Sequence, residues 1–389
     1  MKSTTNENSP LSGYRILDLS DDKGLFCSRL LADIGAKVIR IDRPETRLSQ
    51  KQVVEINNLG KQSLTLNLEI EAGREIFRRL IETADVVVES YPPGYLDKLG
   101  LGYRSLAEIN PRLIMAAITP FGQNGPYRDY HADDIVAAAL GGQLFINGEP
   151  GLPPLKPYGN QNLAGLTTAN GIMLALWQRH SSGRGQYIDI SLQECAAANL
   201  DHTMVRYFYR REVAQRQGGL YWNNAFRIFA CRDGYILLSL FQQWETLVEW
   251  LADEGMAGDL TDDKWRDGER RIEQIEDIIT ILEKWTKSHN VTELVEKGQL
   301  MHFPWAGVLS IDEVSRNPQL AAREFWIEVE HPESGRKYKL PGTAAKLSNS
   351  PWKVGNYSPI PGENNKEIYH QELGLSEKEL ETLTKEGIL

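Results

Sequence analysis

Two adjacent carboxylates are the residues in this chain best suited to nucleophilic or proton-transfer chemistry. Asp133 and Asp134 directly precede the apolar run Ile135–Leu140. A carboxylate can attack an activated carbonyl to form a covalent intermediate, and it can also take up a proton. Acidic residues at this place equally stabilise the positive N-terminus of a helix. A catalytic and a structural role therefore both remain open for the pair.

A second polar stretch, Pro157–Gly165, reads PYGNQNLAG and contains no carboxylate. The amides of Asn160 and Gln161 are neutral and their nitrogen lone pairs are delocalised, so neither can replace an ionisable oxygen nucleophile. The stretch leads into Gln161–Arg179, which is long enough for a central helix and has apolar positions nearly all round. Such a pattern predicts a buried helix.

Basic residues near the first strands suggest a site for a phosphate-bearing ligand. The GxGxxG fingerprint of NAD-binding proteins is missing, and Ser20–Gly24 takes its place, so the backbone cannot close on a pyrophosphate in that manner. The second strand ends in Asp42-Arg43. An Arg here favours a phosphate on the ribose, and coenzyme A (CoA) carries a 3′-phosphate. Arg43 thus suits CoA better than NAD, with a solvated surface position as the alternative for Arg43 and Lys98 alike.

Strand and helix patterns alternate in the N-terminal part, which predicts parallel βαβ units with right-handed crossovers. The fold class is therefore α/β, an open Rossmann-like parallel sheet covered on both faces. The expected strands are Arg15–Leu19, Lys37–Ile41, Ser63–Leu68, Val86–Glu89, Leu113–Ile118 and Tyr187–Leu192, and the expected helices are Leu25–Ile34, Glu71–Thr83 and Gln193–Tyr209.

At 389 residues the chain exceeds what one core usually supports, so more than one domain is expected. We assign residues 1–219 to a large domain and residues 220–325 to a smaller inserted α/β domain with the strands Phe226–Ala230 and Tyr235–Leu240. Residues 326–389 return to the large domain, with a hairpin of Trp326–Glu330 and Arg336–Leu340. A final helix begins at Ser376, where Glu379 completes a capping box.

Composition excludes several classes of partner. The net charge of −10 leaves no basic surplus for a nucleic acid. No apolar run approaches the ~18 residues needed to span a bilayer, and the polar N-terminus lacks a secretory signal. Cys27, Cys195 and Cys231 lie far apart, which fits reduced thiols in the cytoplasm. We therefore expect a cytoplasmic protein without a membrane, a nucleic acid or a bound metal.

Short motifs along the whole chain occur in the order found in one known family. Together with Pro157–Gly165, they make the chain resemble the family III CoA-transferases, a group that includes formyl-CoA transferase and carnitine CoA-transferase. The resemblance implies a CoA thioester as substrate, no prosthetic group, and an interlocked-ring dimer in which each chain threads the other. The motifs are Leu17-Asp18-Leu19, Leu31–Ala36 (LADIGA), Ala84–Glu89 (ADVVVE), Gly183–Gln186 (GRGQ), Pro361-Gly362-Glu363 and Leu373–Ser376 (LGLS).

The resemblance also implies which residues contact CoA. Arg43 falls near the adenosine phosphate, His131 stands where a Lys often contacts the nucleotide, and Asp134 matches an acid near the reacting thioester. Glu69 stands where the family commonly has Lys, and its negative charge opposes a polyanionic ligand. The residues expected to contact CoA are Lys23, Arg43, Leu66, Leu68, Ser90, Tyr91, Lys98, Leu99, His131 and Asp134.

The family attacks its donor thioester with one Asp, which the resemblance places at Gln161, or at Asn160 if one residue is inserted. Some members consist of two related subunits of which only one keeps the Asp, as in the enzyme that moves CoA from succinyl-CoA to (R)-2-benzylsuccinate. This chain resembles the Asp-lacking subunit. We therefore expect a heterodimer or heterotetramer with a paralogous catalytic subunit, and an isolated chain that is inactive.

Two other interpretations stay open: an active homodimeric CoA-transferase that uses Asp133 or Asp134, and a non-enzymatic acyl-CoA-binding protein. The related α-methylacyl-CoA racemases use a His–Asp pair, whose positions hold Asp133 and Asn160 here, so racemase activity is not expected. The segment Gly218–Ala225 matches the family's glycine-rich lid but contains Tyr221 and Trp222. These bulky residues predict a stiffer lid. This is a second departure from the family pattern, and like the missing Asp it indicates that the chain has lost catalytic activity of its own.

Overall fold

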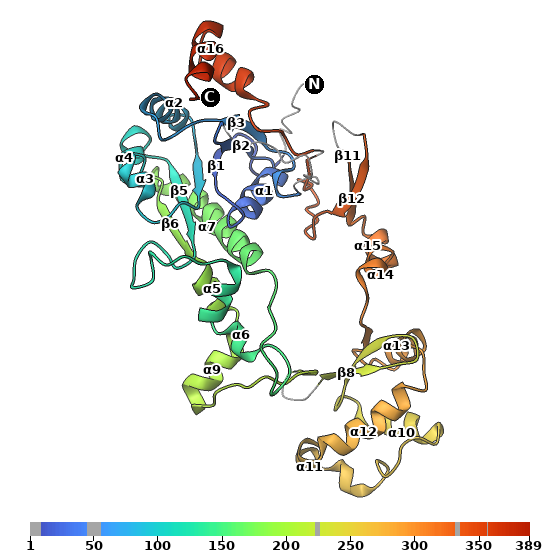
Figure 1. Cartoon of the computed structure of the whole chain (residues 1–389). Helices are drawn as coiled ribbons and strands as arrows, with labels where there is room; N and C mark the ends of the chain where they lie inside the picture. Colours follow the sequence, from blue (N-terminus) through green and yellow to red (C-terminus); the bar gives the residue numbers. More distant parts are fainter. Residues whose placement is uncertain (1–8, 45–55, 222–225, 331–334, 356) are drawn as a thin grey trace. The chain divides into compact units, whose positions relative to one another are not determined.

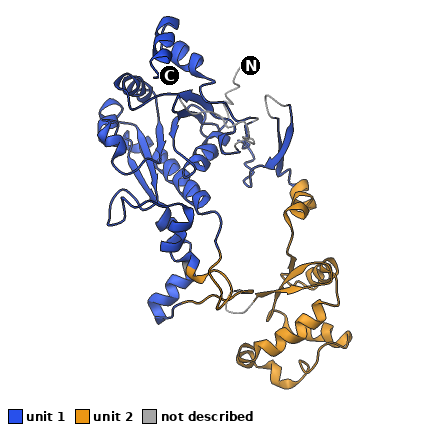
Figure 2. Cartoon of the chain, in the orientation of Figure 1, with its two compact units in different colours: residues 1–144, 156–213, 323–389 blue, residues 145–155, 214–322 orange. Residues whose placement is uncertain are grey.

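The computed structural model describes residues 9–44, 56–221, 226–330, 335–355 and 357–389 (Figure 1). Its internal contacts divide the chain into two units (Figure 2). Unit 1 comprises residues 1–144, 156–213 and 323–389, and unit 2 comprises residues 145–155 and 214–322. Residues 145–155 thus join unit 2 although no sequence pattern marks them.

Unit 1 is built on a six-stranded sheet in the order β3-β2-β1-β4-β5-β6, and every neighbouring pair is parallel. The predicted α/β class with an open parallel sheet is confirmed. The central strands are buried on both faces and read as continuous apolar runs, as parallel strands under helices do. The strands are β1 (Arg15–Leu19), β2 (Lys37–Asp42), β3 (Gln62–Thr65), β4 (Val86–Glu89), β5 (Ile114–Thr119) and β6 (Tyr187–Ser191).

Helices cover both faces of this sheet. Ile16 and Val38 point to one face, where they join a core with α1 (Leu25–Asp33) and α7 (Asn160–Ser182). Their neighbours Leu17 and Ile39 point to the other face, since successive strand residues alternate. That second face is covered by α2 (Glu71–Ile81), α3 (Tyr95–Lys98) and α4 (Tyr103–Ile109), and a short 3₁₀ turn, η1 (Ile56–Asn58), follows β2.

The GRGQ motif proves to be a close-packing element. Gly183 ends α7 in the left-handed region at φ 70°, and a Cβ on Gly185 would lie 1.8 Å from the carbonyl oxygen of Leu113. Only glycine fits such a contact. Arg179, in the last turn of α7, donates to Asp85 at 2.7 Å and to the Arg112 carbonyl at 2.9 Å. The motif therefore fixes the end of α7 against the start of β5.

The structure corrects two expectations about helices. The segment Gln193–Tyr209 is two helices, and the break between them includes Leu200, which is buried beside Gly142. The predicted burial of α7 on all sides is also wrong, since Leu174 and Trp177 are 69% and 79% exposed in the single chain. The remaining helices of this region are α5 (Asp134–Leu140), α6 (Gln143–Ile146), α8 (Leu192–Ala198) and α9 (Asp201–Arg210).

Unit 2 contains an antiparallel sheet in the order β10-β9-β8-β7 and a core with four buried tryptophans, Trp244, Trp265, Trp285 and Trp305. The lid residues 222–225, and with them Trp222, lie outside the described residues. The elements are β7 (Leu220–Tyr221), β8 (Phe226–Ala230), β9 (Tyr235–Ser239), α10 (Trp244–Asp253), η2 (Asp263–Arg266), α11 (Gly268–Glu273), α12 (Ile275–Thr286), α13 (Val291–Leu300), β10 (Ala306–Gly307), α14 (Ile311–Ser315) and α15 (Pro318–Ala322).

The C-terminal part of unit 1 covers the outer edge of β3. Asn364 and Asn365 accept hydrogen bonds from the backbone N–H groups of Ser63 and Thr65, at 2.9 and 3.0 Å. Tyr369 donates to the Thr65 carbonyl at 2.7 Å. Edge strands otherwise present unpaired backbone groups. The elements are the hairpin β11 (Trp326–Glu330) and β12 (Lys337–Pro341), the π-helical η3 (Lys366–Glu372) and α16 (Glu377–Lys385), whose predicted Ser376/Glu379 capping box is confirmed.

Among the described residues, no helix has the length and apolarity to cross a membrane.

Candidate functional site

Most of the candidate residues follow the carboxyl ends of neighbouring strands. Lys23 follows β1, Arg43 follows β2, Ser90 follows β4 and His131 follows β5. Parallel strands end at the same edge, so these segments meet there. The strand order also reverses between β1 and β4, and ligands of open α/β sheets bind outside the carboxyl ends at such a point. The fold thus offers a ligand site where the candidates gather.

One set of contacts joins Lys23 to Ser90 through Asp21. The Lys23 ammonium forms an ion pair with the Asp21 carboxylate. The Ser90 hydroxyl accepts from the Asp21 backbone N–H at 2.7 Å and donates to its carboxylate at 2.8 Å. Asp21 therefore bridges the ends of β1 and β4, a role the sequence did not reveal.

A second set joins Arg43 to Tyr91. The Arg43 guanidinium donates to Glu69 and to the Tyr95 hydroxyl, each at 3.3 Å, and Tyr95 also donates to Glu69. The Tyr95 ring stacks on that of Tyr91, with centroids 4.7 Å apart. Burial, with a contribution from Tyr95, raises the pKa of Tyr91 to about 12, so its hydroxyl stays protonated. The residue expected to meet the phosphate is thus already paired with an anion.

The other CoA candidates differ in their exposure. Leu66 and Leu68 are buried in the core beside β3, so only their backbone could face a ligand, and the Leu66 N–H already donates to the Asp42 carbonyl. Lys98 and His131 are exposed, and Leu99 is half-buried.

The start of α7 brings Asp134 and Gln161 together. An Asp134 carboxylate oxygen accepts from the backbone N–H of Gln161 at 3.2 Å. Asn160, the first residue of α7, is 2% exposed, and its Nδ2 has no hydrogen-bond partner among the described residues. Asp133 is exposed and precedes α5 in extended conformation. Asp134, on α5, is therefore an acid in contact with the expected nucleophile position.

A buried ion pair that no sequence pattern indicated lies beneath the carboxyl ends of the strands. The Asp18 carboxylate accepts from the Lys61 ammonium at 2.9 Å, and both side chains are fully buried. Ser20 and Ser28 donate to the same carboxylate, each at 2.6 Å. Burial alone would raise the pKa of Asp18, but Lys61, Arg40 and these hydrogen bonds outweigh it and lower the pKa to about 2. Asp18 belonged to a quoted motif, yet nothing in that motif indicated Lys61 as its partner.

Glu89 at the end of β4 is a second buried acid without a predicted role. Its carboxylate accepts from the Tyr91 backbone N–H at 2.7 Å and is 5% exposed. Burial, with smaller contributions from Asp97, Asp189 and Asp21, raises its pKa to about 8. Glu89 is therefore largely protonated at neutral pH and adds little negative charge to the carboxyl edge.

We expect Glu89 to make folding stability fall as the pH rises from about 5 to about 8. The unfolded state loses this proton near pH 4.5, whereas the folded state keeps it to about pH 8, so rising pH stabilises the unfolded state relative to the folded state across that window. A shift of this size corresponds to at most ~5 kcal/mol. Glu89→Gln keeps the acceptor oxygen and should remove most of this slope in urea unfolding at pH 5.5 and 8.5. Parallel pH slopes for the variant and the wild type would refute the assignment, and the exposed Glu82→Gln serves as control.

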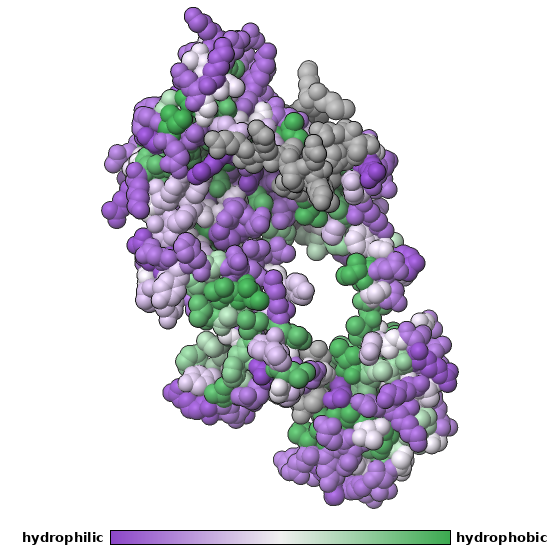
Figure 3. Space-filling view, in the orientation of Figure 1, coloured by the Kyte–Doolittle hydropathy of each residue, from purple (hydrophilic) through white to green (hydrophobic). Residues whose placement is uncertain are grey.

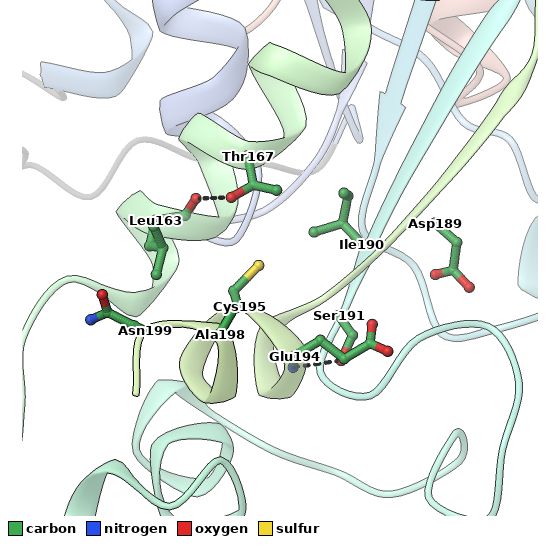
Figure 4. A pocket seen from close by; sticks show the side chains of 9 residues that line it. All are labelled: Leu163, Thr167, Asp189, Ile190, Ser191, Glu194, Cys195, Ala198 and Asn199. Atoms are coloured by element: carbon green, nitrogen blue, oxygen red, sulfur yellow. Dashed lines mark hydrogen bonds between the residues drawn. The ribbon is translucent and has the colours of Figure 1, made fainter. Parts of the chain in front are cut away.

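A pocket of about 320 Å³ lies between α7 and α8 at the end of β6 (Figure 4). The carboxylates of Asp189 and Glu194 oppose a phosphate-bearing ligand there. Burial raises the pKa of the Cys195 thiol, so this cysteine is a poor nucleophile. With its two carboxylates, this pocket therefore differs from the candidate CoA site, which is expected to bind phosphate groups. Its lining consists of Leu163, Thr167, Asp189, Ile190, Ser191, Glu194, Cys195, Ala198 and Asn199.

The fold defines the class of protein, an open parallel α/β protein with its candidate site at the carboxyl edge. Comparison with known proteins then gives the family. Residues 11–365 match the model of CoA-transferase family III, and the chain belongs to this family. The predicted family resemblance is confirmed. In the described residues, no group of three or more His, Cys, Asp or Glu side chains is arranged to hold a metal ion.

Similar proteins cover nearly the whole chain. Subunit BbsE of succinyl-CoA:(R)-benzylsuccinate CoA-transferase from Thauera aromatica is 31% identical, over 97% of this chain and 97% of its own length. Formyl-CoA:oxalate CoA-transferase from Streptomyces avermitilis is also 31% identical, over 97% and 99%. The crystal structure of a CAIB/BAIF family protein from Brucella suis matches with a TM-score of 0.84 at 28% identity, covering 94% of this chain and 100% of that one.

Proposed function

We propose that this chain is the subunit without a nucleophile in a heteromeric family III CoA-transferase. The enzyme moves CoA from an acyl-CoA donor such as succinyl-CoA to a carboxylic acid such as (R)-2-benzylsuccinate, and a paralogous subunit supplies the attacking Asp. The observation that carries the proposal is the first turn of α7, where Asn160, Gln161 and Asn162 are all amides. An amide cannot form the acyl intermediate.

Exposed apolar surface on three helices of unit 1 supports a partner chain. Monomeric proteins rarely leave large contiguous apolar patches in water. Figure 3 shows apolar side chains gathered over the region of α5. The large apolar residues exposed on α5, α7 and α9 are Ile135, Val136, Leu140, Leu166, Met173, Leu174, Trp177, Met204, Val205, Tyr207, Phe208 and Tyr209.

An aromatic cluster between β5 and α5 supports an acceptor with an aromatic ring. The rings of Tyr127 and Tyr130 lie 4.9 Å apart, and both pack against Phe121. Tyr127 and Tyr130 are 40% and 57% exposed, so they present ring surface to a ligand. The BbsE relative, whose name includes benzylsuccinate, agrees with this choice.

Reconstitution tests the proposal. The chain is purified alone and together with a paralogue that carries Asp at the position of Gln161, and CoA transfer from succinyl-CoA to (R)-2-benzylsuccinate is measured. We expect turnover only in the mixture, and replacement of the paralogue's Asp should abolish it. Turnover by the isolated chain, or a mixture that neither associates nor reacts, would refute the proposal.

One observation favours an active homodimer as the second candidate. The carboxylate of Asp134, on α5, accepts a hydrogen bond from Gln161 N in the first turn of α7, so a carboxylate is available beside the position where the resemblance places the family's nucleophile. If the isolated chain turns over, Asp134→Asn should abolish the activity and the acyl adduct. Asp133→Asn, a matched change on the adjacent exposed residue, should leave both intact. An isolated chain that binds acyl-CoA with no turnover in either preparation indicates the non-enzymatic alternative.

A further inference from the structure

The first turn of α7 has donors for a negatively charged group, and the chain satisfies them only in part. We propose that this turn binds the free carboxylate of a small organic acid, with the amide of Asn160 and the backbone N–H of Gln161 as donors. The inference deepens the proposed function and rests on it in one respect. It takes the amides at 160 and 161 to bind a substrate acid at the place where the family's Asp attacks a thioester.

The N-terminus of α7 is suited to an anion. α7 has 23 residues, and its first turn contains no acidic side chain. The first N–H groups of a helix lack partners within the helix and carry partial positive charge, so they attract anions. Of these groups, Gln161 N donates to Asp134. The N-terminus of α7 thus holds one carboxylate already, supplied by α5.

The unpartnered amide of Asn160 is the independent observation. Its side chain is 2% exposed and belongs to the first residue of the helix, and Nδ2 meets no acceptor among the described residues. Buried donors are nearly always hydrogen-bonded, and an exception calls for a missing partner. Asp134 is not that partner, since its carboxylate accepts from the backbone N–H of Gln161 and not from Asn160 Nδ2. A carboxylate has two oxygens and can accept from Nδ2 and from Gln161 N together.

Asp134 acts as an internal substitute for the ligand. Asp134 belongs to α5 and accepts one hydrogen bond from α7, at Gln161 N. The proposed ligand accepts two, from Gln161 N and from Asn160 Nδ2. A ligand carboxylate therefore displaces Asp134, and the two anions compete for the same N–H. Competition of this kind predicts that neutralising Asp134 strengthens binding of the ligand.

Space and neighbouring elements fit the proposal. Gly159 precedes α7 at φ 95°, and a Cβ placed on it would meet no atom within 4 Å, so no other described part of the chain packs on its Cα. A Cβ on Gly165, one turn further on, would lie 3.1 Å from the Cys27 nitrogen in α1. The second turn of α7 therefore packs on the first turn of α1.

Calorimetric titration of the full-length chain with sodium succinate tests the inference, with sodium chloride of equal ionic strength as the blank. We expect Asp134→Asn to tighten succinate binding about ten-fold, since a charged competitor is removed. Asp133→Asn changes charge by the same amount beside it and should leave the affinity unchanged. Asn160→Leu should weaken binding about ten-fold, and the nearly isosteric Asn160→Asp, which places an anion in the site, should abolish it.

The outcomes separate this inference from the proposed function. Equal affinities in the wild type, Asp134→Asn and Asn160→Asp, or no heat of binding in any of them, would overturn the carboxylate site. That result leaves the reconstitution assay unaffected, because the assay depends on the paralogue's Asp. Conversely, turnover by the isolated chain would refute the silent-subunit assignment whatever the titration gives.

Discussion

Replacing Lys61 by Met is expected to destabilise the protein by ~3–5 kcal/mol, because it leaves the fully buried Asp18 carboxylate without its cation. Met matches the length of the Lys side chain, so the loss is electrostatic and not a loss of volume. Without Lys61, burial dominates and raises the pKa of Asp18. The variant should therefore regain stability as the pH falls toward 5, where the buried carboxylate takes up a proton. Urea unfolding at pH 5 and pH 8 measures both effects.

A double variant provides the control for this ion pair. Asp18→Asn combined with Lys61→Met keeps one of the two oxygens that accept from Ser20 and Ser28 and removes both charges of the pair. It should be more stable than Lys61→Met alone and should lose the pH dependence. If the single and the double variants unfold at the same urea concentration, the pair contributes through packing, and the electrostatic account is wrong.

Glu69→Lys should raise the affinity of the isolated chain for CoA by about ten-fold or more at low salt. In the wild type the Arg43 guanidinium is paired with Glu69, and Tyr95 donates to the same carboxylate. The substitution removes the competing anion and adds a cation beside the expected phosphate position, a change of two charges that is worth ~1 kcal/mol or more in a solvated site. Calorimetry or fluorescence titration with CoA at two salt concentrations measures it, and the gain should shrink as salt screens the charges.

Glu82→Lys is the matched control, because it makes the same change in net charge at the opposite end of α2. Glu82 follows the last residue of that helix and is exposed, and a cation is favourable at a helix C-terminus. An equal gain in CoA affinity for both variants would show that total charge matters and the Arg43–Glu69 pair does not. In that event the CoA site would have to be sought elsewhere in the chain.

The strands of unit 1 were predictable because each is a short buried run between turn signals. β1 and β4 have the predicted bounds, and the others differ by only a few residues. The break near Leu200 was not predictable, since no glycine or proline marks it in residues 193–209 and Leu200 is buried beside Gly142, which is distant in sequence. The exposed face of α7 was missed for a related reason: apolar residues indicate burial, but not whether the same chain or another one covers them.

The candidate site could be predicted as a set of residues but not as a set of contacts. Arg43 was predicted from the end of a strand and Lys23 and Ser90 from the family resemblance, and the parallel strand order brings all three to one edge. Their partners Asp21 and Tyr95 were not identified, because ordinary polar and aromatic residues carry no pattern that reveals pairing. Asp134 was recognised as an acid before a helix, yet its contact with Gln161 requires knowing that α5 and α7 begin side by side.

The hydrogen bonds on the outer edge of β3 have a consequence for biosynthesis. Ser63 and its partner Asn364 are 301 positions apart in the chain. While the ribosome is still making the intervening residues, the nascent sheet has an uncovered strand that can pair with another polypeptide. Production of this protein should accordingly depend on chaperones, and a premature stop before residue 364 should yield aggregates even though all six parallel strands have been translated.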